Sequence, residues 1–187
     1  AIARDSDLDG LLLPAGLNGL TPFQRKVVSE LYQPMKKDPD DREGIGRVLS
    51  KLGDAIPPEL KTALTPRRPM EELRPNVQRR GFDTSEELIA YLNANVDKPP
   101  GFEWHHVIPE DQPESDWLTD ELKRRYINNT SNIVLIPTMK HMLITAAMNT
   151  RIKAIGLLRR EAFARYDLDI QRRVGEFFLI LSGCATW

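Results

Sequence analysis

The three histidines of the chain all lie within one short region, between His105 and His141. His105 and His106 are adjacent, in a run of aromatic and apolar residues typical of a β-strand, and His141 follows a second β-like run. Adjacent side chains of a strand point to opposite faces, so two consecutive histidines of a regular strand cannot both bind one ion. This spacing predicts that one imidazole binds a metal ion while its neighbour acts as a base on water, and that His141 completes the metal pair from a helix.

The elements that must position these histidines can be predicted from their local patterns. Residues 102–108 form a short apolar or aromatic stretch, an acidic loop follows, and Thr119 caps a helix that runs to about Ile127. The run 133–136 is predicted as a strand, and Pro137 with Thr138 starts the next helix. The last helix has an apolar stripe that is predicted to face the core, formed by Ile170, Val174, Phe177 and Leu181.

The region from Phe102 carries the pattern Phe-Glu-x-His-His-x-x-Pro, followed by Asn132 and, nine residues further on, by His141. This pattern resembles the HNH nucleases of the ββα-metal (His-Me finger) superfamily, especially the colicin-type DNases and the WHH-type toxin nucleases of bacterial polymorphic toxins. The resemblance implies that His105 and His141 are metal ligands and that His106 is the general base that deprotonates the attacking water. It also implies that Asn132 positions this base through the backbone of the loop.

The resemblance extends from Gly101 to about Thr145 and has consequences for the metal site. It implies that Glu103 supports an arginine that contacts phosphate. Colicin-type enzymes have a further histidine four residues along the helix, where this chain has Thr145. One divalent ion is therefore expected, held by two imidazoles with water and the scissile phosphate or by an acid not identified from the sequence, and its identity is open among Mg, Zn, Ni and Mn.

Simpler interpretations compete with these assignments. The two adjacent histidines are also consistent with ordinary residues beside a buried Trp104, because a histidine more often has a structural than a catalytic position. Asn132 stands in an Asn-rich run that would suit a turn. Glu103 needs no function as a surface acid at the start of a strand.

Charge is segregated along the chain although the net charge is −1, from 26 Lys and Arg against 27 Asp and Glu. The stretch 103–121 has acids and no Lys or Arg, whereas 122–160 has bases and no acid. Each base alone would suit a solvated helix face, but their shared sign predicts a surface for nucleic acid. The predicted contacts are Arg124, Arg125, Lys140, Arg151, Lys153, Arg159 and Arg160. The acidic loop 110–120 is expected to face away from nucleic acid or to meet a basic protein partner.

Length and composition predict a folded α+β chain that is predominantly helical. The chain has 187 residues, 41% hydrophobic and 28% charged, and no apolar run long enough to span a membrane. Prolines divide the first half into short helices, one of which starts at Thr21 and ends before Pro34, and 66–80 is predicted as a loop. Pro99 and Pro100 predict a boundary between a helical lobe, 1–100, and a nuclease core with a C-terminal helical extension, 101–187.

The predicted function is metal-dependent hydrolysis of DNA with weak sequence preference, by chemistry that also accommodates RNA. The resemblance implies the toxin domain of an antibacterial effector, secreted to act in the target-cell cytoplasm and neutralised in its producer by an immunity protein. No signal peptide is visible, and the missing initiator Met is expected of a fragment. The alternatives are a restriction-type or mobile-element HNH endonuclease and a non-enzymatic helical module that binds a structural metal, although such a site needs more protein ligands than are present.

Overall fold

The computed structural model describes residues 30–31, 33–38, 40–52, 62, 65–113 and 115–186. This part of the chain is mixed α and β, mainly helical with small two-stranded sheets, as predicted. The helices are α3 (Arg42–Leu52), α5 (Met70–Leu73), α6 (Ser85–Asn95), α7 (Asp120–Leu122), α8 (Thr138–Met148), α9 (Arg159–Phe163) and α10 (Leu168–Leu181), with a π-helical turn η4 (Lys123–Ile127) and a 3-10 turn η5 (Thr130–Asn132). The strands are β1 (Arg68–Pro69), β2 (Phe102–His106), β3 (Ile133–Pro137), β4 (Arg151–Ile152), β5 (Leu157–Leu158) and β6 (Ala185–Thr186).

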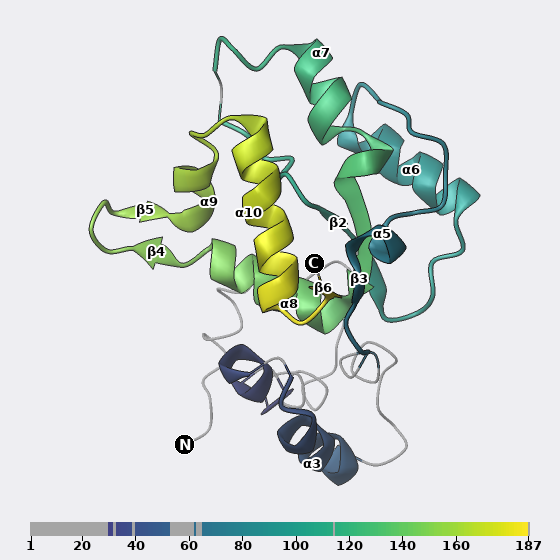
Figure 1. Cartoon of the computed structure of the whole chain (residues 1–187), viewed down its shortest axis with the longest axis vertical. Coiled ribbons are helices and arrows are strands. Elements are labelled where there is room, and N and C mark those ends of the chain that lie inside the picture. The colour runs from purple at the N-terminus through teal and green to yellow at the C-terminus, as the bar shows by residue number, and fades with distance from the viewer. Residues whose placement is uncertain are drawn as a thin grey trace.

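Strands β2 and β3 pair in antiparallel fashion, and α8 follows β3 directly (Figure 1). The register runs from Phe102 opposite Pro137 to His106 opposite Ile133. The predicted strand after residue 132 and the predicted helix start at Thr138 are both confirmed. The long connection between the two strands contains the acidic loop, α7, η4 and η5. Because the strands are antiparallel, the end of β2, which carries both histidines, lies beside the start of β3.

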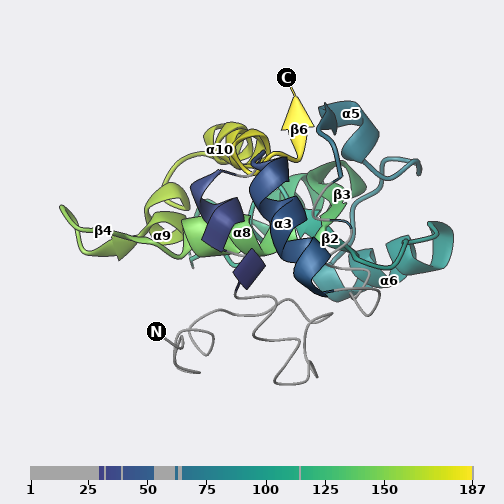
Figure 2. The same ribbon diagram turned by 90° about the horizontal axis from the view of Figure 1, so that it is seen from below.

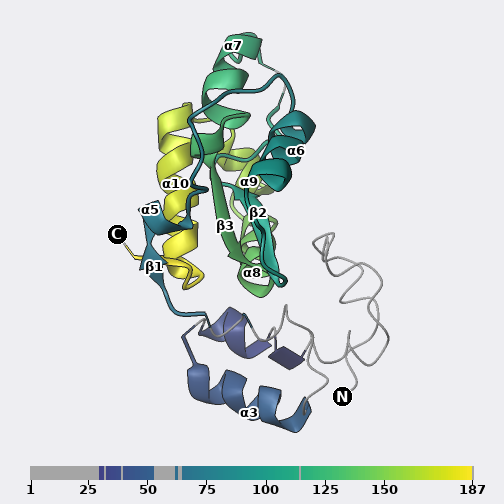
Figure 3. The ribbon, with the colours of Figure 1, turned by 90° about the vertical axis from the view of Figure 1, so that its right-hand side faces the viewer.

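The sheet of β2 and β3 is covered on both faces, by α6 on one side and by α8 and α10 on the other (Figure 3). Trp104 and Ile133 pack with Leu88 and Leu92 of α6. The alternate residues of β3, including Val134, pack in the cluster that contains α8 and α10 residues. Because side chains alternate along a strand, this arrangement sends successive residues of β2 to different helices.

The predicted core stripe of α10 is wrong. Ile170, Phe177 and Leu181 are 42%, 47% and 51% exposed, and only Val174 of the stripe is partly buried against the core. The buried residues of α10 are Leu168, Gln171, Gly175, Phe178 and Leu179. The helix packs through Gly175, where an added Cβ would lie 1.9 Å from Val107 O. Because Gly175 faces Val107, most of the apolar stripe lies on the exposed side of the helix.

The chain does not separate at Gly101 as predicted. The clusters on both faces of β2 and β3 contain residues from before Gly101, among them Leu88 of α6 and Met70 of α5. Strand β1 pairs in parallel with β6 near the other end of the described chain. Pro99 and Pro100 therefore stand at a turn within one packed unit, because apolar residues before and after them share the same clusters.

Predictions for the first hundred residues had mixed outcomes. The start of the helix predicted from Thr21 lies outside the described residues, and residues 33–37 are helical, so an end before Pro34 is wrong. The segment 66–80, predicted as a loop, contains β1 and α5. Helix α3 lies at the end of the molecule beyond α8 (Figures 1 and 2). Among the described helices, none has the length and apolar character needed to cross a membrane.

Candidate active site

The two adjacent histidines of β2 point to opposite faces of the sheet, as predicted. His105 lies beside His141 of α8, with ring centroids 5.0 Å apart and ring planes at 73°. His106 lies beside Ser85, the first residue of α6, with 3.4 Å between Nε2 and Ser85 Oγ. One strand thus presents one imidazole to each of the two helices that cover it.

His105 and His141 form a close imidazole pair in a largely buried position. Burial lowers the pKa of His105 well below its usual range, and the neighbouring imidazoles lower it further. His105 is therefore neutral at pH 7, with a ring nitrogen lone pair available as an acceptor or ligand. The pair is reached from a cavity of about 290 Å³, whose walls include His106, Glu110, Thr145 and Arg160.

Glu103 lies on the same face of β2 as His105, two residues before it, and Glu103 Oε2 is 3.1 Å from His141 Nδ1. Both side chains are mostly buried, at 14% and 22% exposure for Glu103 and His141. The two atoms are close enough for a hydrogen bond, but their geometry does not form one, and His141 Nδ1 is buried without a hydrogen-bond partner. The sequence did not predict this contact, since the resemblance placed Glu103 beside an arginine.

The residues around His105 suit an open metal position rather than a closed protein cage. Two imidazoles and a nearby carboxylate are donors that divalent ions accept. A bound ion would also give His141 Nδ1, which is buried without a hydrogen-bond partner, a favourable contact. Among the described residues, however, no group of three or more His, Cys, Asp and Glu is arranged to hold a metal. Thr145 also lines the cavity, at the position where a further histidine would be expected. Water or substrate oxygens would have to complete the coordination.

His106 has two polar neighbours on the other face of the strand. Besides Ser85, Glu110 Oε2 lies 3.9 Å from His106 Nε2, and the His106 side chain is 12% exposed. Burial lowers the pKa of His106, while the charge of Glu110 opposes that shift. The imidazole is therefore neutral at pH 7 and able to accept a proton.

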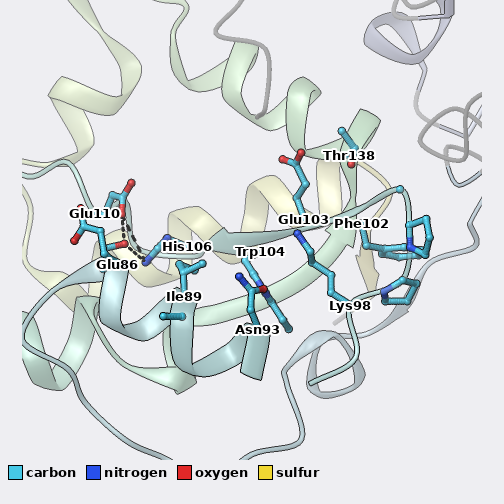
Figure 4. Close-up of a pocket in the computed structure, with 15 residues that line it drawn as sticks. Glu86, Ile89, Asn93, Lys98, Phe102, Glu103, Trp104, His106, Glu110 and Thr138 are labelled. Atoms are coloured by element: carbon cyan, nitrogen blue, oxygen red, sulfur yellow. Dashed lines mark hydrogen bonds and ion pairs between the residues drawn. The ribbon is translucent and has the colours of Figure 1, made fainter. Parts of the chain in front are cut away.

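A second and larger hollow, of about 820 Å³, lies on the α6 side of β2 and also reaches His106 (Figure 4). His106 and Glu110 lie at one end of this hollow and Lys98 towards the other, with Trp104 between them. The indole Nε1 of Trp104 donates to Asn93 Oδ1 at 2.8 Å, which fixes the wall of the hollow. His106 is thus accessible from both sides of the strand.

Asn132 holds the loop that follows His106. It is fully buried, its Oδ1 accepts from Ile108 N at 2.9 Å, and its Nδ2 donates to Ile108 O at 2.9 Å and to Ile127 O at 3.0 Å. The backbone carbonyl of Asn132 also accepts from Val107 N at 2.9 Å. Asn132 therefore does more than form a turn, because its side chain fixes the backbone of the loop that follows His106.

Of the predicted nucleic-acid contacts, Lys140 must be withdrawn. It is 3% exposed, and its Nζ donates to Thr65 O at 2.7 Å and to Gly183 O at 2.6 Å. A buried ammonium bound to two carbonyls cannot reach a phosphate at the surface. Lys140 instead links α8 to segments near both ends of the packed unit.

The other predicted bases occupy different surroundings. Arg160 lines the histidine cavity, and its Nη1 lies 3.7 Å from Asp111 Oδ2. Arg151 and Lys153 are exposed on the β4–β5 hairpin, which projects beyond α9 (Figure 1), and Arg159 follows β5. Two others lie on η4, away from this group, where Arg124 pairs with Asp83 and Arg125 stacks on Tyr126. The structure thus brings only part of the predicted set to the histidines.

The acidic loop, expected to face away from nucleic acid or to meet a basic protein partner, begins at the histidine cavity. Glu110 and Asp111 both line the cavity of the histidines, next to His106 and Arg160 respectively. The loop returns to the site because Asn132 binds Ile108 and because Gln112 Nε2 donates to Gln171 Oε1 at 2.9 Å.

Three residues of this region were missed from the sequence. Ser85 contacts His106 from a helix far away in the chain, Gln171 is a buried polar residue of α10 that binds the loop, and Gly175 lets α10 approach Val107. Gln171 is one of several polar residues of its helix, and nothing local marked it as buried. Ser85 had no signal that linked it to His106.

Comparison of the chain with models of protein families, with curated proteins and with solved structures found no match.

Proposed function

We propose that this protein is a metal-dependent endonuclease with a ββα-metal (His-Me finger) core formed by β2, β3 and α8. The observation that carries the proposal is the pairing of His105 with His141 at 5.0 Å between ring centroids, while the next residue of the strand points to the opposite face. The long connection from β2 to β3 is held at Ile108 by Asn132. The arrangement of β2, the loop after it and α8 thereby supports the sequence resemblance, which rests on four positions: His105, His106, Asn132 and His141.

In this proposal His105 and His141 hold one divalent ion, one of Mg, Zn, Ni or Mn. Such an ion supplies positive charge that stabilises the pentacovalent phosphorus and the leaving oxygen. Glu103 Oε2 lies 3.1 Å from His141 Nδ1, so this carboxylate stands beside the proposed pair of ligands as an oxygen donor. Burial keeps the pKa of His105 low, so its nitrogen does not compete for a proton at neutral pH.

His106 is the proposed general base. Its ring is neutral at pH 7 because burial lowers its pKa, and it lies at the wall shared by two hollows large enough to admit water. The ring takes a proton from water, and the resulting hydroxide attacks phosphorus in line with the leaving oxygen. Asn132 keeps the base in position by fixing the backbone two residues after it.

The proposed substrate is DNA, bound through its backbone with weak sequence preference. Arg160 lies at the cavity, and Arg151, Lys153 and Arg159 extend the positive surface from it along the β4–β5 hairpin and the start of α9. Backbone contacts of this kind carry no base readout. The same chemistry would act on RNA, and the comparison of the two substrates belongs in the test.

The biological setting is proposed from the resemblance to colicin-type and WHH-type toxin nucleases. The chain would be the toxin domain of a secreted antibacterial effector that acts in the target-cell cytoplasm, with an immunity protein as partner in the producer. Trp117, 45% exposed within the acidic loop, and the exposed stripe of α10 are surfaces suited to a protein partner.

The test uses end-labelled DNA and RNA oligonucleotides of the same sequence, incubated with the full chain and a divalent ion. We expect DNA to be cut, and His106→Ala to reduce the rate by about two to four orders of magnitude, the usual contribution of a positioned base. Cleavage of both nucleic acids by the variant at the parent rate would remove His106 from the mechanism.

A further inference from the structure

The His106 ring has two oxygen atoms near the same nitrogen. Nε2 lies 3.4 Å from Ser85 Oγ and 3.9 Å from Glu110 Oε2, and Ser85 Oγ donates a short hydrogen bond to Glu110 Oε2. Figure 4 shows Glu110 and His106 turned towards each other at one end of the hollow. Ser85 comes from α6 and Glu110 from the loop after β2, so two separate elements converge on one ring nitrogen.

The proton inventory of these three groups determines which nitrogen of His106 is protonated. A serine hydroxyl has one proton, and here Ser85 gives it to the Glu110 carboxylate. Towards His106 Nε2, Ser85 Oγ can therefore only accept. An ionised carboxylate is also an acceptor only. The Ser85 oxygen near Nε2 thus needs a donor there, and the carboxylate 3.9 Å away favours one, so the neutral ring carries its proton on Nε2.

We propose that Ser85 and Glu110 are positioning residues that hold His106 in the Nε2–H tautomer, so that Nδ1 is the nitrogen that takes the proton from water. The assignment of the tautomer stands on the contacts of the ring, and its use in catalysis rests on the proposed function. In that step an O–H bond of water breaks, the proton binds Nδ1, and hydroxide remains for the attack on phosphorus. The ring becomes an imidazolium whose Nε2–H faces Glu110, and the carboxylate charge stabilises it.

Substitutions at both positions should leave the fold intact. The cap of α6 is made by Thr84, whose side chain accepts from Glu87 N, so the Ser85 hydroxyl is not needed to start the helix. Glu110 has a side chain that is 55% exposed. Ser85→Ala and Glu110→Gln therefore test the contacts to His106 with little loss of packing. Glu86→Gln is the matched control, since it removes a charge beside Ser85 from the same hollow.

The direct measurement is a long-range ¹H–¹⁵N spectrum of the histidine-labelled full chain, treated with chelator, at about pH 8, where an ordinary imidazole is neutral. His106→Gln assigns the signals by their disappearance. We expect the Nε2–H tautomer for His106 in the parent and in Glu86→Gln, and a mixture of tautomers in Ser85→Ala and Glu110→Gln. A parent ring protonated on Nδ1, or an unchanged Nε2–H tautomer in either variant, would overturn the proposal.

Cleavage kinetics then test the use of this tautomer. Ser85→Ala and Glu110→Gln should lower kcat by about one order of magnitude, part of what a positioned base contributes, with KM unchanged. Ser85→Thr, which keeps the hydroxyl, should restore most of kcat. A rise in KM with unchanged kcat would contradict the positioning effect. A chain with the Nε2–H tautomer that cuts neither DNA nor RNA would refute the proposed function and leave the tautomer assignment standing.

Discussion

The side chain of Asn132 clamps the backbone of Ile108 through two hydrogen bonds: Oδ1 accepts from Ile108 N and Nδ2 donates to Ile108 O, at 2.9 Å each. A third hydrogen bond joins the same amide to Ile127 O at 3.0 Å. This one side chain therefore replaces strand pairing at the point where the chain leaves β2. His106 is the last residue of that strand, so its position depends on the clamp.

Asn132→Ala should be strongly destabilising and should also reduce cleavage by folded protein. The substitution leaves three buried backbone groups without partners, and we expect a loss of about 2–4 kcal/mol in the free energy of unfolding, measured in urea. Asn128→Ala is the control, because that side chain donates one hydrogen bond, to Asp83 O at 3.1 Å. If Asn132→Ala kept the parent free energy of unfolding and the parent cleavage rate, the hydrogen bonds to Ile108 would contribute neither to stability nor to the position of His106.

Gly175→Ala should destabilise the protein because a Cβ at that position would lie 1.9 Å from Val107 O, a backbone atom with little room to move. We expect a loss of about 3 kcal/mol, the upper part of the usual range for overpacking. Gly46→Ala in α3 is matched to it, since a Cβ there meets nothing within 4 Å and should stabilise by about 0.4–1 kcal/mol. Equal urea midpoints for the two variants would contradict the close approach of α10 to the loop.

Local chemistry explains which parts of this fold could be predicted. Thr84 and Thr119 cap α6 and α7 through contacts within three residues, and Pro137 ends β3 where a helix begins. The opposite orientation of His105 and His106 follows from strand geometry alone. Each of these features depends on neighbours in the chain.

The features that sequence reasoning missed depend on distant contacts. Lys140 had the same charge as its neighbours in the basic run, but two carbonyls from remote segments accept its protons in the interior. The apolar stripe of α10 had helical spacing, yet Gly175 sets which side faces the loop, and Phe177 remains exposed. Ser85 is separated from His106 by 21 positions, and nothing in its surroundings in the chain marks it as a partner.

Binding to duplex DNA should weaken steeply as salt rises, despite the net charge of −1, because each phosphate contact releases condensed counterions. Fluorescence anisotropy across a salt series measures the slope. Neutralising Arg160 of the cavity together with Arg151, Lys153 and Arg159 of the β4–β5 hairpin and the start of α9 should flatten it.

Two control variants separate this effect from general loss of charge. Replacing Lys36 and Lys37, which are exposed and do not line the histidine cavity, should leave the salt slope unchanged. Lys140→Met should lower stability without changing the slope, because the ammonium is buried. A parent slope near zero would mean that the positive surface is not used for nucleic acid.

His105→Ala and His141→Ala should each weaken binding of a divalent ion, since the two rings lie 5.0 Å apart and are the proposed ligands. Losing a ligand should cost at least the roughly 10- to 100-fold seen when a residue behind a ligand is removed. Isothermal titration of the metal alone into chelator-stripped protein gives the affinities, with His106→Ala expected to bind as the parent does. If both ligand variants bind the ion as tightly as the parent, the metal assignment is wrong.

Cleavage of supercoiled plasmid by chelator-stripped protein, before and after a divalent ion is restored, measures whether this protein is a metal-dependent nuclease. We expect no nicking in chelator, rapid nicking when the ion returns, and a rate about two to four orders of magnitude lower for His106→Ala under the same conditions. Plasmid that stays supercoiled with parent protein in the presence of each of Mg, Mn, Ni and Zn would contradict this expectation, as would nicking that chelator and His106→Ala both leave unchanged.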